Sequence, residues 1–426
     1  MKHWSRRFLV VMLLGAAVHA QQPAPSQASA IPVMQFDAVL RQALDKNPTL
    51  ARATTNITRA EQLLQQARAI TLPLVTTTLQ NSTLDSARGF AGGITQPQNQ
   101  FFIGASASMA ILNSARWAQV TQARDQVTVA EADTVEVRQQ IVVSAAQTYL
   151  AVIAAHRQVE VSERAIDAAR AHLDYATKRF EGGAGSRLNQ LRASQVVSSE
   201  ETRLEVVRMA LRSAQEALGV IIAADGPIDA GADPVFDMTG TMEDTSWAQA
   251  RPDLLTQIAV QRAAERVVKD SWRDWVPIVN TSFDPTYVTP AGLFQPAKTW
   301  RLTFLAIQPI YEGGQRKIAL RQRELTLDQS KIEMTALEIN ARSEVRLAQE
   351  TLRSRERTAI LARRASDEAA EVLRITTAAF EVGATTNLEV IDAQRSDLDA
   401  KTAAQTADNA VQRARLDLLV ALGRFK

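Results

Sequence analysis

Apolar residues recur every seven positions along two long stretches of the chain, 115–180 and 315–380. The repeated positions are Val152, Val159, Ile166, Leu173 and Phe180 in the first stretch and Val345, Leu352, Ala359, Leu373 and Phe380 in the second. The first stretch contains neither proline nor glycine. Its about 66 residues therefore suffice for roughly 100 Å of uninterrupted helix, at about 1.5 Å per residue. A seven-residue spacing predicts that such helices pack as left-handed coiled coils.

Four shorter stretches alternate with a period of two, which is typical of strands. They cover 72–80, 100–112, 276–287 and 300–310. Six large apolar residues lie at alternate positions of two of them: Phe101, Ile103, Met109, Trp300, Leu302 and Phe304. Strands of a transmembrane barrel have about 9–11 residues and this alternation, so these six side chains are predicted to face lipid. A sheet that covers a soluble core would alternate in a similar way and stays as the alternative.

The same elements occur twice in the same order. Four pairs of segments match: Asn47-Pro48 with Arg251-Pro252, Leu72-Pro73 with Val276-Pro277, Gly183-Ala184 with Gly383-Ala384, and Leu218-Gly219 with Leu422-Gly423. The chain is therefore expected to be a tandem duplication, with repeats over 36–222 and 246–426 and a linker over 223–245. Each repeat is predicted to contain a helix, two strands, a long helix and a return helix. The expected first helix covers 36–70, the first loop between strands 81–99, and the return helices 188–222 and 388–422.

The number of strands has a consequence for assembly. Four strands cannot close a transmembrane barrel, since known barrels have at least eight. The chain would have to pool its strands with copies of itself, and its helices would then form a tube on the same axis. Three copies would supply twelve strands, although the sequence alone does not give the number of copies.

The N-terminus carries the features of an export signal. Basic residues within the first seven positions precede an apolar run over 8–18 that is too short to span a membrane as a helix. Small residues follow at the positions that a signal peptidase reads, so 1–20 is predicted to be a signal peptide, with a membrane anchor as the alternative. Residues 21–35 are expected to form a flexible tether. Removing the three basic residues changes the formal net charge from +2 to −1, which gives no reason to expect a nucleic-acid partner.

The residues that usually carry chemistry do not form an enzyme site. The chain has no cysteine, which excludes disulfides and thiolate metal ligands. Beyond the signal peptide only His156 and His172 remain, sixteen positions apart, and this is not the spacing of metal ligands. No phosphate-binding glycine-rich loop or nucleophile elbow occurs. We therefore expect no catalytic activity, no metal and no cofactor.

The mature sequence resembles the TolC-like outer-membrane efflux protein family over essentially its whole length. The resemblance rests on Asn47-Pro48, on the segment Gln-Pro-Ile-Tyr-Glu-Gly-Gly over 308–314, on the turns around Gly183 and Gly383, and on Asn-Leu-Glu-Val-Ile-Asp-Ala-Gln over 387–394. These motifs are specific in combination and weak singly. The first repeat departs from the pattern at 110–115, where the proline and the glycine pair are missing.

The resemblance implies a mainly α protein with a transmembrane β part. Three protomers would form a twelve-stranded β-barrel in the outer membrane of a Gram-negative bacterium, continuous with a coiled-coil α-helical tunnel through the periplasm. Such a homotrimer would be the passive exit duct of a tripartite efflux or type I secretion system. Its partners would be a periplasmic adaptor protein, an inner-membrane pump that supplies the energy, and outer-membrane lipid.

The resemblance also assigns residues to two sites at the periplasmic end. The helix turns that face the adaptor would contain Gly182, Gly183, Ala184, Val382, Gly383 and Ala384. Glu389 and Asp392 match acidic positions that ring the periplasmic aperture in related channels, and Asn189 and Arg192 occupy the matching places in the first repeat. Three-fold repetition would gather six carboxylates around a narrow lumen and favour cations. A solvated helix face is the alternative for Glu389 and Asp392.

Two other classes of protein carry long helical hairpins. A periplasmic adaptor should show one hairpin flanked by short glycine-rich β-domains, whereas this sequence predicts two hairpins and no such domains. A purely structural coiled coil would not need the strands, and it should stay soluble without detergent. The transported cargo is not encoded in any motif of the sequence.

Overall fold

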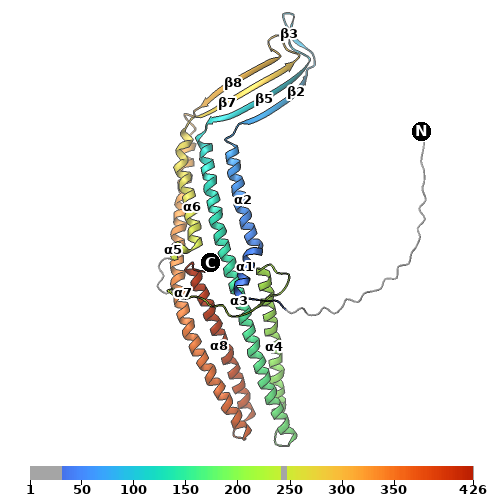
Figure 1. Cartoon of the computed structure of the whole chain (residues 1–426), viewed down its shortest axis with the longest axis vertical. Coiled ribbons are helices and arrows are strands. Elements are labelled where there is room, and N and C mark those ends of the chain that lie inside the picture. The colour runs from blue at the N-terminus through green and yellow to red at the C-terminus, as the bar shows by residue number, and fades with distance from the viewer. Residues whose placement is uncertain (1–30, 241–246, 426) are drawn as a thin grey trace, which may run out of the picture.

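The computed structural model describes residues 31–240 and 247–425. They form an elongated molecule with a sheet at one end and two helical hairpins at the other (Figure 1). The predicted signal peptide over 1–20 and most of the predicted tether lie outside the described residues. No helix within 31–240 or 247–425 combines the length and the apolar character that crossing a membrane requires.

Two long helices run from the sheet to the hairpin tips, as the seven-residue spacing predicts. They are α3 (Ser114–Glu181), with 68 residues, and α7 (Gln315–Glu381), with 67 residues. The first begins where the side chain of Asn113 accepts a hydrogen bond from the backbone N–H of Arg116 at 3.1 Å, which caps the helix. Each is the one continuous long helix of its repeat, and the shorter helices pack against it.

The shorter helices pack on the two halves of each long helix. In the first repeat they are α1 (Phe36–Lys46), α2 (Pro48–Ala69) and α4 (Arg187–Ile221); in the second they are α5 (Trp247–Ala250), α6 (Pro252–Lys269) and α8 (Asn387–Ala421). A short 3₁₀ helix, η1 (Asp270–Trp275), follows α6. In the half nearer the sheet the helices are ordered α2, α3, α6, α7, and in the other half α4, α3, α8, α7.

The prediction of one helix over 36–70 is wrong, because the chain breaks at Asn47. A residue before proline avoids helical geometry, and Asn47 has φ −67° and ψ 124° before Pro48. Its side chain accepts a hydrogen bond from the backbone N–H of Thr49 at 2.8 Å and so caps α2. The same side chain donates to the carbonyl of Ile221, the last residue of α4, at 2.9 Å. The break therefore ties the start of α2 to the end of the return helix.

The sheet contains two strands from each repeat in the order β2-β5-β7-β8, all antiparallel. These strands are β2 (Leu74–Thr83), β5 (Asn99–Leu112), β7 (Ile278–Thr289) and β8 (Lys298–Ile307). Among the described residues, β2 and β8 each have one edge without a strand partner. The predicted loop over 81–99 instead contains a small hairpin, β3 (Arg88–Phe90) and β4 (Gly93–Gln96). Ala91 and Gly92 both have positive φ, which is the geometry of a two-residue hairpin turn.

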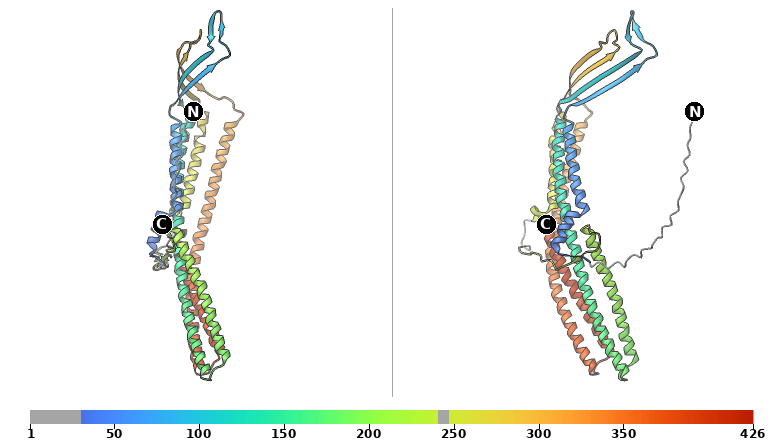
Figure 2. Two further views of the ribbon diagram at one scale, coloured as in Figure 1. Left: turned by 90° about the vertical axis from the view of Figure 1, so that its right-hand side faces the viewer. Right: turned by 45° about the vertical axis from the view of Figure 1, so that its right-hand side comes forward.

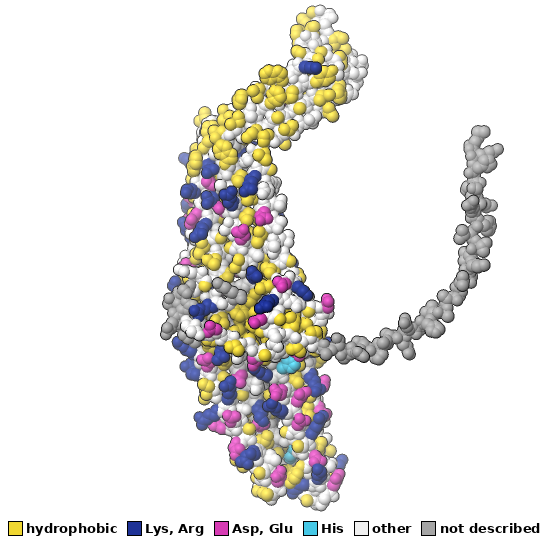
Figure 3. Space-filling view, in the orientation of Figure 1, with side chains coloured by type: hydrophobic (Ala, Val, Ile, Leu, Met, Phe, Trp, Pro, Cys, Tyr) yellow, Lys and Arg dark blue, Asp and Glu magenta, His cyan; other side chains and the backbone are white. Residues whose placement is uncertain are grey.

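The strand register places the six predicted lipid-facing residues on one face of the sheet. Met109 of β5 is paired with Thr281 of β7, which is paired in turn with Phe304 of β8. Directly paired residues share a face and successive residues alternate, so Phe101, Ile103, Trp300 and Leu302 lie on the face of Met109 and Phe304. Figure 3 shows hydrophobic side chains over the sheet, whereas charged side chains gather over the helices.

The opposite face of the sheet is polar around Asp284. Asp284 of β7 accepts hydrogen bonds from Ser106 Oγ at 2.5 Å and from Ser282 Oγ at 2.8 Å. Arg301 of β8 is paired directly with Asp284. The two faces of the sheet therefore differ: one carries large apolar side chains, and the other carries a hydrogen-bonded polar cluster.

A compact layer crosses the helices at the waist of the molecule (Figure 2). It contains a parallel pair of short strands, β1 (Val33–Met34) and β6 (Asp229–Ala230). Tyr149 of α3 is fully buried there, and its hydroxyl donates to the carbonyl of Ala232 at 2.8 Å. The tether predicted over 21–35 is therefore wrong for its last residues, since Val33 and Met34 belong to this layer.

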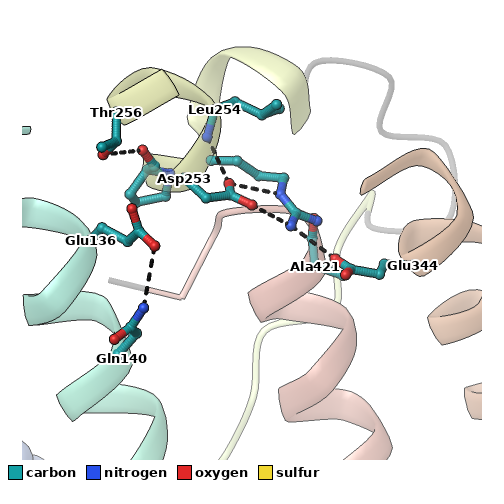
Figure 4. Close-up of polar contacts among 9 residues, drawn as sticks. Glu136, Gln140, Asp253, Leu254, Thr256, Glu344 and Ala421 are labelled. Carbon is teal, nitrogen blue, oxygen red and sulfur yellow. Dashed lines mark hydrogen bonds and ion pairs between the residues drawn. The ribbon is translucent and has the colours of Figure 1, made fainter. Parts of the chain in front are cut away.

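Arg251 ties three helices of the second repeat together at the same level. Its buried guanidinium donates to both carboxylate oxygens of Asp253, at 3.1 and 2.7 Å, and to Glu344 of α7 at 2.8 Å. It also donates to the carbonyl of Ala421, the last residue of α8, at 3.3 Å. Figure 4 shows Asp253, Glu344 and Ala421 converging from α6, α7 and α8. Burial by itself would lower the pKa of Arg251, but the bonds to Asp253 and Glu344 outweigh it and raise the pKa.

Glu136 of α3 lies beside the first turn of α6, on the other side of this junction (Figure 4). Burial raises the pKa of Glu136, and the charges of Asp253 and Asp133 raise it further, against a hydrogen bond from Thr256 that lowers it. Gln140 Nε2 donates to Glu136 Oε1 at 3.3 Å. The contact of α3 with α6 thus joins the two repeats through a partly buried carboxyl group.

The two return helices end in the same backbone motif, which corrects the predicted match of Leu218-Gly219 with Leu422-Gly423. Ala223 has φ +50° and Gly423 has φ +66°, each just after the end of its helix. The next residue in each case donates its N–H to a carbonyl five positions earlier, at 2.9 Å. Ala223 is therefore the structural counterpart of Gly423.

Replacing Ala223 by glycine is expected to stabilise the protein by about 0.5–1 kcal/mol, because glycine adopts positive φ without steric cost. The reverse change, Gly423→Ala, is expected to destabilise it by at least as much, since the added Cβ would lie 2.7 Å from the carbonyl carbon of Ala250. Thermal unfolding of the detergent-solubilised protein, followed by circular dichroism, measures both. A lower midpoint for Ala223→Gly would contradict the cap assignment.

Candidate functional site

The candidate site is the end of the molecule where both helical hairpins turn. The hairpin of α3 and α4 and the hairpin of α7 and α8 end side by side, far from the sheet (Figures 1 and 2). All the residues that the sequence analysis singled out for docking and for the aperture lie in these two turns or in the first two turns of the return helices.

Both hairpin turns have the left-handed glycine that the sequence predicts. Gly183 has φ +74° and Gly383 has φ +80°. Ala184 donates its N–H to the carbonyl of Arg179 at 2.9 Å, and Ala384 donates to Ala379 at 2.7 Å, which satisfies the carbonyls at the helix ends. The six predicted docking residues, Gly182, Gly183, Ala184, Val382, Gly383 and Ala384, are all exposed. Their geometry is settled by turn chemistry, and their role in docking stays a prediction.

Glu389 and Asp392 lie on the exposed side of the first two turns of α8. Glu389 has a structural role that the sequence analysis did not assign. Its carboxylate accepts a hydrogen bond from the N–H of Thr386 at 3.2 Å, and its own N–H donates to Thr386 Oγ1 at 3.4 Å. This reciprocal pair is a capping box. The carboxylate of Asp392 makes no hydrogen bond or ion pair with the rest of the described chain.

The matching residues of the first repeat lie at the start of α4. Ser186 caps that helix by accepting a hydrogen bond from the N–H of Asn189 at 3.2 Å, and Arg192 is exposed one turn further on. No hydrogen bond or ion pair within the described residues joins Arg192 to Glu389 or Asp392. A single protomer thus presents its acidic pair and its Asn/Arg pair on separate hairpins.

The structure also shows a junction between the hairpins that the sequence analysis missed. Nε2 of His172 on α3 lies 2.7 Å from Oδ1 of Asn387, the first residue of α8. The imidazole also contacts the ring of Phe380, at 5.6 Å between centroids, and Tyr175 packs edge-on against the same ring. Arg179 lies over Phe380 with its guanidinium carbon 5.5 Å from the ring centroid. These five residues, His172, Tyr175, Arg179, Phe380 and Asn387, form the tip junction.

The tip junction is partly desolvated. His172 is 8% exposed and Asn387 is 3% exposed. Burial lowers the pKa of His172 below its usual value, and the hydrogen bond with Asn387 opposes that effect only in part. Nδ2 of Asn387 is buried without a hydrogen-bond partner in the described structure. The two hairpins therefore meet through a buried polar contact whose partners are 215 positions apart in the sequence.

Comparisons with known proteins agree with this architecture. The model of the outer membrane efflux protein family matches residues 39–224 and 246–424. No curated protein matches the chain significantly in sequence. The solved outer membrane protein VceC of Vibrio cholerae is similar, with a TM-score of 0.78, 19% identity, and coverage of 91% of this chain and 96% of that one.

Two outer membrane channels give similar results. CmeC of Campylobacter jejuni has a TM-score of 0.78 and 15% identity, covering 91% of this chain and 85% of that one. MtrE of Neisseria gonorrhoeae, in its open state, has a TM-score of 0.76 and 18% identity, covering 92% of this chain and 89% of that one. At these identities the solved structures establish only the fold of the chain. The match to the family model establishes its evolutionary relationship.

Proposed function

Since the chain belongs to the outer membrane efflux protein family, we propose that it is the exit duct of a tripartite efflux or type I secretion system. The protein is located in the outer membrane of a Gram-negative bacterium, with a helical tunnel in the periplasm. In this proposal the duct conducts passively, because a pump in the inner membrane supplies the energy and a periplasmic adaptor joins the two. The duct itself performs no chemistry.

The observation that carries the proposal is a sheet with one apolar exposed face and two unpaired edges. Trp300 is 72% exposed and Phe304 is 66% exposed on that face. An unpaired strand edge leaves backbone N–H and C=O groups without partners, which is not tolerated in lipid. Pairing β8 of one copy with β2 of the next satisfies both edges, and three copies close a twelve-stranded barrel.

The helices support the same assembly. The layer of helices has α7 on one side and α2 and α4 on the other, so it is open at both sides like the sheet. Along α7, Ile318, Leu325, Ile332 and Ile339 recur every seven residues and are 59%, 52%, 69% and 58% exposed. Such a stripe is typical of a coiled-coil seam that lacks its partner. In a homotrimer the neighbouring copy would cover it.

The exposed turns supply a surface for the adaptor. Gly182, Gly183, Ala184, Val382, Gly383 and Ala384 project at the far end from the sheet, and Val382 is 82% exposed. An apolar side chain at a turn that faces away from the core is suited to contact with another protein. We assign adaptor docking to these six residues.

The duct itself is tested by reconstituting the full-length protein in a planar lipid bilayer. We expect discrete conductance steps, and an oligomer that survives unheated SDS. A folded protein that stays soluble without detergent and never inserts would contradict the proposal and support a structural coiled coil.

The aperture assignment is tested by removing charge without removing the helix cap. We expect Glu389→Gln/Asp392→Asn to lower the preference for cations over anions severalfold, because six carboxylates would leave the lumen of a trimer. Glutamine keeps the capping box that Glu389 forms, so the hairpin should stay folded. The measurement is the reversal potential across a bilayer under a KCl gradient.

A matched control removes the same charge from exposed positions elsewhere on the hairpins. Asp174→Asn/Glu371→Gln neutralises two carboxylates that form exposed ion pairs with Lys178 and Arg374. Selectivity should be unchanged in this variant. If both variants lose the same selectivity, Glu389 and Asp392 are ordinary solvated carboxylates.

A further inference from the structure

Near the tips, three hydrogen bonds connect α3 to the second hairpin within the described chain. Tyr175 OH donates to the carbonyl of Glu381 at 3.4 Å, and Arg179 donates to the carbonyl of Phe380 at 3.5 Å. The third joins His172 to Asn387 at 2.7 Å, and it is the shortest and the only buried one of the three. The contact of His172 with Asn387 is therefore the main polar restraint between the two tips.

A neutral histidine satisfies this contact with a single proton. An amide oxygen can only accept a hydrogen bond, so Nε2 of His172 carries the proton that reaches Oδ1 of Asn387. In this neutral tautomer Nδ1 carries no proton. Protonation would add a second N–H, at Nδ1, to a ring that is 8% exposed and packs against Phe380, and a buried cation without a partner is costly.

No charged group of the neighbouring elements compensates that cation. The charged residues of the surrounding turns are Arg170, Asp174, Lys178, Arg179 and Glu181 on α3, Arg187, Arg192, Glu200 and Glu201 on α4, Glu371, Arg374 and Glu381 on α7, and Glu389, Asp392 and Arg395 on α8. Several are paired with each other, as in Arg170–Glu201 and Lys178–Asp174. Within the described chain, none forms an ion pair with His172, and Arg179 places a positive charge on the ring that His172 also contacts.

We propose that His172 makes the separation of the two hairpin tips depend on pH, so that mild acid favours separated tips. This rests on the proposed function, since tip separation widens the periplasmic end of the duct. His172 acts here as a positioning residue: it contacts no substrate, and it acts by holding α8 against α3.

The direction follows from proton binding in the two arrangements. When the tips are apart, His172 is solvated and its pKa is near the ordinary value of about 6.5. When they are joined, burial holds the pKa lower. Above about pH 6.5 neither form is protonated and the junction has its full stability. Below it, only the separated form binds the proton, so the ratio of separated to joined tips rises by up to about tenfold per pH unit, until the lowered pKa is reached.

The test measures tip separation directly. The chain has no cysteine, so spin labels can be placed selectively at the exposed positions Leu188 and Leu388, one on each hairpin, by Leu188→Cys/Leu388→Cys. Mixing labelled with excess unlabelled protein isolates the distance within one protomer. Between pH 7.5 and 5.5 we expect the ratio of long to short distances to rise severalfold, by at most about tenfold. His172→Gln, which keeps a donor and cannot titrate, should show no such rise.

Two further variants keep the outcome interpretable. His156→Gln changes the other described histidine, which contacts Asp229 at the waist, and it should keep the full pH response. Asn387→Asp offers a carboxylate to the imidazolium, so acid should then favour joined tips and the response should reverse. An unchanged response in His172→Gln, or no reversal in Asn387→Asp, would overturn the inference. Conductance of the same samples separates the two proposals: a channel whose tip distances ignore pH refutes only the role of His172.

Discussion

Replacing Leu302 with arginine is expected to prevent stable insertion of the protein into the outer membrane, whereas Thr303→Arg is expected to be tolerated. Leu302 is paired with Phe283 on the apolar face, and Thr303 is paired with Ser282 on the polar face. An arginine on the lipid face near the middle of the bilayer costs about 2–4 kcal/mol, and the proposed homotrimer would carry the change in every copy. The polar face already accommodates Arg301.

The two variants are compared by the amount of oligomer that survives unheated SDS in outer-membrane fractions. They share strand, depth and added charge, and they differ in the face on which the arginine lies. Loss of oligomer in both would indicate a general intolerance of the strand rather than contact with lipid. Normal amounts of both would mean that the apolar face of the sheet does not meet the membrane.

The parts of the fold that depend on local pattern could be predicted from the sequence. The long helices α3 and α7 follow from seven-residue spacing within stretches that contain neither proline nor glycine, and the structure extends each by only one or two residues. The two faces of the sheet follow from alternation, and the register confirms which large residues share a face. Both signals are local, because a side chain's position on a helix or a strand depends on residues a few positions away.

Other features carry a local turn or helix-boundary signal that a prediction from periodicity alone does not use. Asn47 precedes a proline, which is a strong sign of a helix boundary, and the chain does break there. Ala91-Gly92 is a turn signal inside a segment that was expected to be loop, and it forms the tip of a hairpin. The dipeptide Leu-Gly occurs at 218 and at 422, but these positions are not equivalent in the structure. Helix ends are matched by backbone geometry rather than by residue type.

The contacts between segments far apart in the sequence had no such signal. The pairing of Val33 with Asp229 and the contact of His172 with Asn387 join residues about 200 positions apart. A two-residue strand is too short to show alternation, and a single histidine in a helix is more often a surface residue than a junction. These contacts exist because distant segments of the chain pack against each other in the folded protein, and their partners follow from that packing alone.

At the waist, the two repeats hold the same helix junction with different side chains. Asn47 and Arg251 both precede the proline that begins a helix, and both donate a hydrogen bond to the carbonyl of the last residue of the return helix. Asn47 does so as a neutral amide. Arg251 brings a charge into a buried position, so the second repeat also needs Asp253 and Glu344 around it.

Arg251→Met is therefore expected to destabilise the helical half of the protein by about 2–4 kcal/mol. The change removes the donor that reaches Asp253, Glu344 and the carbonyl of Ala421, and it leaves at Asp253 a carboxylate that is only 25% exposed. The loss is measured as the fall in the thermal unfolding midpoint of the helical signal. Arg364→Met is the control, because Arg364 forms an exposed pair with Glu368 that contributes at most about 0.5 kcal/mol.

A second change decides whether the uncompensated charge is the cause. Asp253→Asn in the Arg251→Met background removes the stranded carboxylate and keeps an oxygen that accepts the N–H of Leu254, a bond now 2.9 Å long. Part of the lost stability should then return, and the two changes should be non-additive because the residues are in contact. If Arg251→Met costs no more than Arg364→Met, the three helices are held by apolar packing alone, and the charge at Arg251 is a by-product of duplication rather than a requirement of the fold.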